Sequence, residues 1–258
     1  MRRIVLIAVV FAVALLLLGV SIPLILRWRT DADRARCQNN LRQLALALSD
    51  YAQKHKEFPA GTVVVPGLPP EKRLSWVVSQ LPRLGHPELE AAIDKTASWD
   101  APANRLPADT FLVELVCPAI YALHPADNPA PLHYPGMAGV GPDAPTLPPD
   151  SPRAGVFRYD APTPVAALRD GVSHCLLLLE TGSNPGRWIA GGPASVRSLD
   201  PATRPYLGPG RPFGGGHPGG ANAAFADGSV RFFTDQTSPE VLEMLAAIAD
   251  GNPADNSQ

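Results

Sequence analysis

The sequence begins with a long apolar run, and an amphipathic stripe follows shortly after it. The run covers residues 4–26, which are 23 residues without a charge. A helix of that length extends roughly 30 Å, about the hydrocarbon thickness of a bilayer. The stripe consists of apolar residues at steps of three and four: Leu41, Leu44, Ala45, Leu48, Tyr51 and Ala52. We therefore expect a membrane-spanning helix joined to a helical stem, with a break or bend where Pro23, Thr30 and Asp31 interrupt it.

The apolar run also divides the chain. The predicted segments are a cytoplasmic stub with a transmembrane anchor (1–30), an extracytoplasmic domain (31–250) made of a stem (31–58) and a globular head (59–250), and a disordered tail (251–258). A secretory signal peptide is the alternative, with Gly19 and Ser21 as small residues before a cleavage site. Because such signals carry an apolar stretch of only about 7–15 residues, the longer run favours an anchor.

Composition limits the class of partner. The net charge is −2 and 18% of the residues are charged, so the chain lacks the basic surface that nucleic-acid binding requires, and we expect no nucleic acid. The 30 prolines and 22 glycines indicate many loops. Two long loops are expected over residues 124–153 and 182–220, and loops of that length are often functional.

The rest of the pattern indicates an α+β fold. Its predicted elements are short helices over 74–84 and 86–95, strands over 155–160, 175–181 and 187–192, and a strand or short buried helix over 110–117. Asp227-Gly228 lies between two short apolar runs, which is typical of a tight hairpin whose turn needs a positive φ. Ser238, Pro239 and Glu240 supply the N-cap, the first-turn proline and the first-turn acid of a last helix.

The three cysteines, Cys37, Cys117 and Cys175, have no CxxC spacing, so a zinc ribbon or a thioredoxin-type site has no support. In an oxidising compartment one pair can bridge, and we take Cys37 and Cys117 as the candidate disulfide. Cys175 begins a short apolar run that is typical of a buried strand, where a cysteine behaves as a small hydrophobic residue. We expect no metal ion and no cofactor.

His217 and Asp227 are a pair that can reach one another across the mouth of the predicted hairpin. A histidine and a carboxylate can hold a metal or transfer protons. The simpler interpretation is structural, with Asp227 serving the turn and His217 bonding to a loop backbone. The glycine-rich segment around His217 opens a hairpin instead of a helix, so it does not indicate a phosphate loop. We therefore assign His217, Asp227 and Gly228 to a structural hairpin motif.

Two other groupings make weaker cases for chemistry. Asp170, Ser173 and His174 are the residue types of a hydrolase, but neighbours on a strand point to opposite faces, so Ser173 and His174 are not expected to meet. The first long loop carries three polar residues without metal-ligand spacing: His124, Asp127 and His133. No catalytic residue is predicted.

Four segments of the chain resemble those of a known family. CQNNLRQLALALSDYAQKHKEFPAG, which starts at Cys37, is similar to a stem segment with a Cys, two Asn, a Leu and an FPxG end. Cys117-Pro118 matches a Cys-Pro pair. DGVSHCLLLLET resembles DGTSNTLLVxE and keeps four of its residues: Asp170, Gly171, Ser173 and Glu180. The fourth, FGGGHPGGANAAFADGSVRFF, holds a His, nine residues and Asp-Gly, here His217 and Asp227-Gly228.

Together these segments resemble bacterial type IV pilin-like, or pseudopilin-like, proteins with the prepilin-type processing-associated domain, over about residues 34–250. The resemblance implies a pilin-like fold, in which one long N-terminal helix packs on a small antiparallel sheet with long Pro- and Gly-rich loops. It implies a single-pass protein of the bacterial inner membrane with a periplasmic or otherwise extracytoplasmic C-terminal domain. Its expected partners are other pilin-like subunits or a secretion apparatus, and the resemblance brings no catalytic residues.

The start of the chain departs from the pilin-like pattern. Such proteins normally carry a short basic leader, a Gly-Phe junction and a nearby Glu. Here Met1, Arg2 and Arg3 run straight into Ile4, and the apolar run contains no acid. We therefore expect a permanent anchor in membrane lipid through residues 4–26, more than a cleaved and polymerising subunit.

Three functions follow as expectations. The first is a non-enzymatic, membrane-anchored structural or interaction protein of a secretion or surface-filament system. The alternative is a tethered binding module whose two long loops recognise a glycan or a peptide. The third is a hydrolase that uses His217 with a nearby acid.

Overall fold

The computed structural model describes residues 2–122, 130–249 and 251, and for several residues between 3 and 18 it describes the helix but not the side chains. The predicted tail, apart from Gly251, lies outside the described residues. Searched over its described residues, the structure holds no helix that combines the length and the apolarity needed to cross a membrane.

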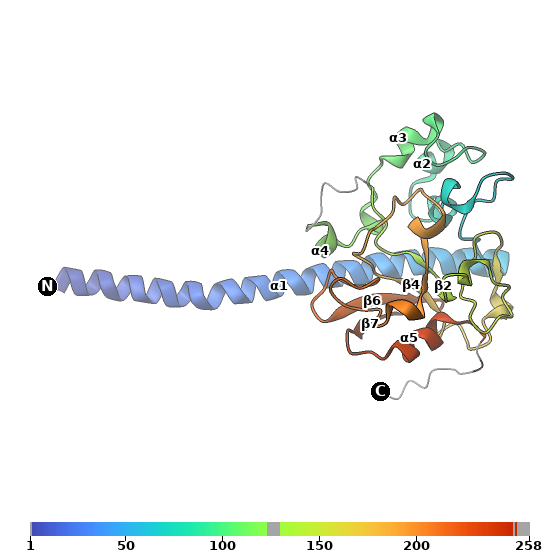
Figure 1. The fold of residues 1–258 in the computed structure, drawn as a ribbon. Helices are drawn as coiled ribbons and strands as arrows, with labels where there is room; N and C mark the ends of the chain where they lie inside the picture. Colours follow the sequence, from blue (N-terminus) through green and yellow to red (C-terminus); the bar gives the residue numbers. More distant parts are fainter. Residues whose placement is uncertain (1, 123–129, 250, 252–258) are drawn as a thin grey trace.

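The predicted anchor and stem form one continuous helix, α1 (Arg2–His55), without the predicted break between them. Pro23 lies inside it, where it removes one backbone donor but does not end the helix. Thr30 also fits, because its hydroxyl donates to the carbonyl of Leu26 at 3.0 Å. The helix is therefore unbroken, and a break at these residues is wrong. The first half of α1 extends far from the folded body (Figure 1).

The second half of α1 packs on the body through the predicted stripe. Leu41, Leu44 and Leu48 are fully buried, whereas Leu46 on the opposite side is 55% exposed. The helix contacts β4, β6 and β7 of the main sheet. In Figure 1 the helix runs along the sheet, with the small helix α5 on the other side.

Among the described residues, five strands form the main sheet: β2 (Gly136–Val140), β4 (Leu176–Leu179), β5 (Val196–Leu199), β6 (Gly220–Phe225) and β7 (Val230–Thr234). Their spatial order is β5-β2-β4-β6-β7. The chain reverses from β2 into β4 and again into β5, so β2 and β5 run in the same direction and pair in parallel. The other neighbours are antiparallel. The sheet is therefore mixed, and not purely antiparallel as expected. A second sheet pairs β1 (Glu57–Phe58) with β3 (Thr163–Pro164).

The central strand β4 is buried along its whole length because both faces of the sheet are covered. Leu177 and Leu178 belong to the core beneath α1, and Leu176 and Leu179 pack in a second core with α5 (Pro239–Ala246). A continuous apolar run is what such a doubly covered strand requires. The start of α5 is also as predicted, since the Ser238 hydroxyl accepts a hydrogen bond from the backbone of Val241.

β6 and β7 are joined by a turn at Asp227-Gly228. Gly228 has a φ of 86°, and its N–H donates to the carbonyl of Phe225 at 2.9 Å. Asp227 Oδ1 accepts from the backbone of Ser229 at 2.8 Å. The turn therefore uses one positive φ, at the glycine, and the aspartate side chain stabilises it.

The predicted strands over residues 155–160 and 187–192 do not form. The first segment runs beside β2 but makes no regular ladder, because its register is uneven. The N–H of Gly155 donates to Ala138 and that of Phe157 to Met137, so the segment advances two residues where β2 advances one. The second makes only isolated bridges. Conversely, β2 and β5 lie inside the two segments that were expected to be long loops.

The remaining helical segments are short. The predicted helices over 74–84 and 86–95 are reduced to a 3-10 helix η2 (Trp76–Gln80) and to α2 (Pro87–Ala91), and 110–117 contains the 3-10 helix η4 (Val113–Leu115). The others are α3 (Arg105–Ala108), α4 (Pro118–Tyr121), η1 (Pro70–Lys72), η3 (Pro102–Asn104), η5 (Ala144–Thr146), η6 (Val165–Ala167), η7 (Gly192–Ala194) and η8 (Pro201–Thr203).

Candidate functional site

Two cysteines from distant parts of the chain meet beneath α1. Cys37 lies on the buried side of α1, one turn before Leu41, and Cys117 lies immediately before α4. Both are fully buried, and their sulfur atoms are 2.7 Å apart. Both are free cysteines in the structure. The structure thus brings the candidate pair together, while the disulfide itself stays a prediction.

A histidine and a carboxylate complete this buried cluster. His217 lies in the loop before β6, and its Nε2 is 3.5 Å from the sulfur of Cys117. The same nitrogen is 3.2 Å from Oε1 of Glu180, which directly follows β4. Both side chains are 1% exposed. We call Cys37, Cys117, Glu180 and His217 the Cys-His-Glu cluster; one ligand atom from each lies within 4.8 Å of the others.

A second layer of polar groups holds the carboxylate of the cluster. Asn222 on β6 donates to Glu180 Oε2 twice, from its backbone nitrogen and from Nδ2, each at 3.0 Å. Gln38 on α1 in turn donates to Asn222 Oδ1 at 3.2 Å. Apart from the ion pair with His217, no described group contacts Glu180 Oε1 as a hydrogen-bond donor. His217 Nδ1 and the Tyr134 hydroxyl are also buried without a hydrogen-bond partner among the described residues. Oε1 is therefore left facing the cluster.

The pKa of Glu180 is lowered and that of His217 is raised, as expected for a buried ion pair. Burial alone would raise the pKa of Glu180, but the contacts with His217 outweigh it and lower that pKa. Burial likewise opposes charge on His217, yet the contacts with Cys37 and Glu180 raise its pKa to about 9. The hydrogen bond with Cys117 lowers the pKa of the Cys37 thiol, whereas burial raises that of Cys117. At neutral pH a protonated imidazole therefore faces an ionised carboxylate.

The other residues that the sequence singled out lie elsewhere. Asp227 and Gly228 form the turn after β6, whereas His217 lies before the start of that strand and is placed beside Glu180 and Cys117. Ser173 Oγ lies 3.2 Å from His174 Nδ1, against expectation, because this segment is a turn instead of a strand. His133 is buried, and its Nδ1 accepts a hydrogen bond from the Cys117 backbone at 2.9 Å. His124 and Asp127 are outside the described residues.

Sequence reasoning did not assign Glu180 to a site. It belongs only to the segment that resembles DGTSNTLLVxE, although its position carries a signal. A carboxylate that directly follows four buried leucines is unusual, because ionised groups are seldom fully buried without a partner. That position is therefore a candidate for a charge-specific role.

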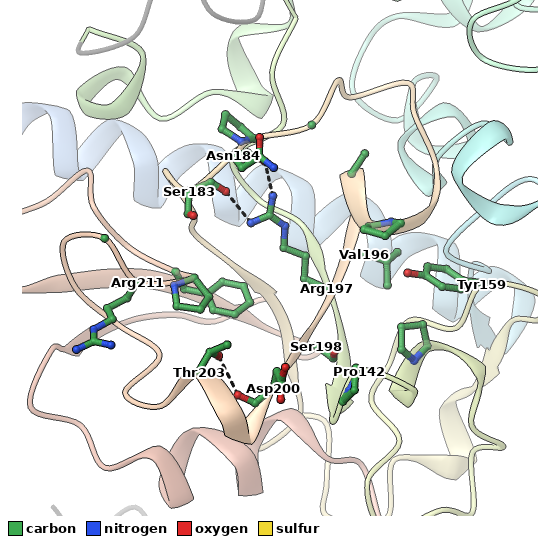
Figure 2. A pocket seen from close by; sticks show the side chains of 18 residues that line it. Pro142, Tyr159, Ser183, Asn184, Val196, Arg197, Ser198, Asp200, Thr203 and Arg211 are labelled. Carbon is green, nitrogen blue, oxygen red and sulfur yellow. Dashed lines mark hydrogen bonds between the residues drawn. The ribbon is translucent and has the colours of Figure 1, made fainter.

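A cavity of about 840 Å³ lies on another part of the molecule, where the two predicted long loops meet. Pro142 and Pro145 come from the first loop, and most of the other lining residues come from the second. Figure 2 shows Tyr159, Asp200 and Arg197 around it. The lining is mixed, with apolar rings and prolines beside a few polar groups.

Arg197 is the most constrained charged group of this cavity. Its guanidinium donates to Thr181 Oγ1 at 3.1 Å and to the carbonyls of Ser183 and Asn184 at 2.8 and 2.6 Å. Figure 2 shows it directed at the loop that carries the last two residues. Burial lowers the pKa of Arg197. These three acceptors are all neutral, so they do not offset the charge of Arg197; the cavity lining also includes Arg211 and the carboxylate of Asp200.

The chain was compared with known proteins. Residues 27–240 match the model of a family described as a protein of unknown function, DUF1559. No curated protein and no solved structure matches. The match covers most of the chain, including all four members of the Cys-His-Glu cluster. The chain therefore belongs to the DUF1559 family.

Proposed function

We propose that this chain is a membrane-anchored, pilin-like protein of a bacterial inner membrane, with a non-enzymatic structural or interaction role in a secretion or surface-filament system. The observation that carries the proposal is the division of α1. Its second half is buried in the head, whereas its first half leaves the body and presents apolar side chains, such as Leu16 at 69% and Phe11 at 66% exposure.

The exposed apolar half needs a partner, because a surface of this size in water is unfavourable. Burial of apolar area is worth roughly 25 cal/mol per Å², and large bare apolar patches mark interaction or membrane sites. The proposal rests on the whole uncharged run over residues 4–26, which includes side chains outside the described set. A bilayer fits its length.

Membrane association can be tested by fractionation of bacteria that express the full chain. We expect the chain in the membrane pellet after alkaline carbonate washing, and the head cleaved when protease is added to spheroplasts. A double change, Leu16→Lys with Leu17→Lys, should release the chain, since each lysine at a helix centre opposes insertion by about 3 kcal/mol.

A matched control applies the same chemistry to the head. Leu106 and Val113 are 86% and 68% exposed there, so Leu106→Lys with Val113→Lys should leave the chain in the pellet. Recovery of the unaltered chain in the soluble fraction would contradict the anchor. A head protected from protease in spheroplasts would contradict the proposed orientation.

The structural role predicts contact between copies or with another membrane component. A photo-crosslinking residue at Trp28, which is 73% exposed just beyond the run, should give discrete higher bands in membranes. If the chain stays monomeric under these conditions and no second protein is linked, the filament or secretion role should be abandoned.

The 840 Å³ cavity favours a second candidate function, a tethered module that binds a glycan or a peptide. Its unneutralised Arg197 favours a ligand with a carboxylate, held beside the ring of Tyr159. Calorimetry of the full chain against a uronic-acid polysaccharide, a neutral polysaccharide and an acidic peptide would test this. Binding heat that is lost in Arg197→Gln while this variant is shown to be folded, and that is kept in Arg153→Gln, would support the proposal. The absence of heat with all three ligands would remove it.

A further inference from the structure

We propose that the Cys-His-Glu cluster binds one thiophilic divalent cation, of which zinc is the expected member. The site is made by Cys37 on α1, Cys117 before α4, Glu180 after β4 and His217 before β6. The proposal does not depend on the proposed membrane role, because it concerns the interior of the head.

The donor set specifies the class of metal. Two sulfurs, one imidazole nitrogen and one carboxylate oxygen are ligand types that Zn²⁺ accepts in a four-coordinate site. Thiolates select against hard cations such as Ca²⁺ and Mg²⁺, which prefer oxygen ligands. Four ligands without an open position are typical of a structural site and not of a catalytic one.

Burial adds an independent reason for a cation. Glu180 is 1% exposed and places one oxygen, Oε2, on Asn222. Oε1 lies 3.2 Å from His217 Nε2 as an ion pair, but no described donor meets it with hydrogen-bond geometry. A buried carboxylate oxygen that is only partly satisfied in this way is costly. A cation bound at Oε1 removes that deficit. Asn222 and Gln38 then act as the outer groups that orient a metal ligand.

The four elements also suit a clamp. Cys37 and Cys117 are 80 residues apart in the sequence, and Cys117 and His217 are 100 residues apart, yet their side chains meet. A cation at their meeting point ties α1, the α4 segment and the adjoining ends of the interior strands β4 and β6 together. Such a tie is strongest when it closes long loops of the chain.

Binding requires a small adjustment and releases protons. The two sulfurs are 2.7 Å apart, whereas two thiolates on one tetrahedral zinc, each about 2.3 Å from it, are separated by roughly 3.7 Å. The cysteine side chains must therefore move apart by about 1 Å. The cation replaces the protons on the sulfurs and on His217 Nε2, and these protons pass to solvent.

The competing state is a disulfide between Cys37 and Cys117. It would need an oxidant to remove two electrons and two protons, and it would withdraw both thiolates from any metal. The two states are mutually exclusive and differ in metal content, in free thiols and in mass.

The test uses the full chain, purified anaerobically in detergent without a chelator. Metal content is measured by mass spectrometry of the elements, and thiols are counted in denaturant with a chelator present. We expect one zinc ion per chain and three reactive thiols. Cobalt substituted for zinc should give the visible absorption bands of a tetrahedral thiolate site.

The variants separate ligation from folding. Cys117→Ser should lose the metal, while Cys175→Ser, a buried cysteine outside the cluster, should keep it. Because Cys117→Ser can disturb the fold, Glu180→Gln provides a second case. It retains the shape and should lower zinc affinity by about tenfold or more and shift the cobalt bands.

Two outcomes would overturn the proposal. One is a metal-free chain with one reactive thiol and a mass lower by two hydrogens, which identifies the disulfide. The other is a folded chain with three reactive thiols that takes up neither zinc nor cobalt. Unchanged cobalt bands in Glu180→Gln would remove Glu180 from the ligand set and so also contradict the site as proposed.

Discussion

Asn222 holds Glu180 through two hydrogen bonds to the same carboxylate oxygen, one from its backbone nitrogen and one from its side chain, each at 3.0 Å. With Gln38, which donates to Asn222 from α1, this makes a polar bridge between helix and sheet inside an otherwise apolar interface. A bridge of this kind is stabilising only while every member is satisfied.

The bridge can be broken by Asn222→Leu, which keeps the side-chain volume. It removes the side-chain donor to a buried carboxylate and leaves the Gln38 amide without its acceptor, so we expect a loss of about 2–4 kcal/mol in the free energy of unfolding. Urea titration measures it. Gln43→Leu, which changes an exposed amide on α1, should stay within about 0.5 kcal/mol. Equal effects of the two changes would argue against the bridge.

The packing of the stem gives a second prediction. Leu44 is fully buried, whereas Leu46, two residues further, is 55% exposed. Leu44→Ala should destabilise the head by about 2–5 kcal/mol through lost burial and a cavity. Leu46→Ala makes the same chemical change on the open face and should cost far less. If both variants unfold at the same urea concentration, the stem does not pack as the structure shows.

Local signals account for what the sequence predicted correctly. Ser238 and Pro239 fix the start of α5 by capping, and Gly228 fixes the turn before β7, since each depends only on neighbouring residues. The buried stripe of α1 follows from its periodicity in the same way. These features can be predicted without knowing the contacts between residues that are distant in the sequence.

Long-range contacts account for what was missed. β2 contains two glycines and follows no period, and its place is set by pairing with β4 and β5, which are distant in sequence. Residues 155–160 have the composition of a strand, but their hydrogen bonds to β2 step unevenly, from Ala138 to Met137, so no regular strand forms.

The candidate site divides in the same way. Cys37, Cys117 and His217 were each singled out, but as a disulfide pair and a separate hairpin motif. Glu180 joins them only because β4 and β6 pair and place its carboxylate beside His217. The spacing of these four residues along the sequence does not predict that they meet, because each comes from a different element.

Arg197 in the cavity wall provides a third prediction. Its guanidinium holds Thr181, Ser183 and Asn184 through three hydrogen bonds, so Arg197→Met leaves three acceptors without that donor. We expect a loss of about 1–3 kcal/mol, measured by urea unfolding. Arg211→Met, on the exposed side of the same cavity, should have little effect. A stable Arg197→Met variant would show that the loop is held by other contacts.

The last prediction concerns the pH dependence of an ion pair beside α5, on the face of the sheet opposite α1. Glu243 on α5 accepts hydrogen bonds from Arg204, at 2.7 Å from Nε, and from the Tyr206 hydroxyl. Burial raises the pKa of Glu243, but these two donors outweigh it, so the pKa is lowered overall. Burial and the carboxylate raise the pKa of Tyr206 to about 12, which keeps its hydroxyl a donor.

The sign of the effect follows from linkage. A carboxyl whose pKa is lower in the folded state contributes stability above its unfolded pKa of about 4.3, and loses it as the pH falls through the folded value. Glu243→Gln should therefore lower the melting temperature at about pH 7 and differ less from the unaltered chain at about pH 3. Glu240→Gln removes a more exposed partner of the same arginine, 3.3 Å away, and should change little at either pH. A gap between Glu243→Gln and the unaltered chain that is as wide in acid as at neutral pH would mean that the side chain acts through packing and not through its charge.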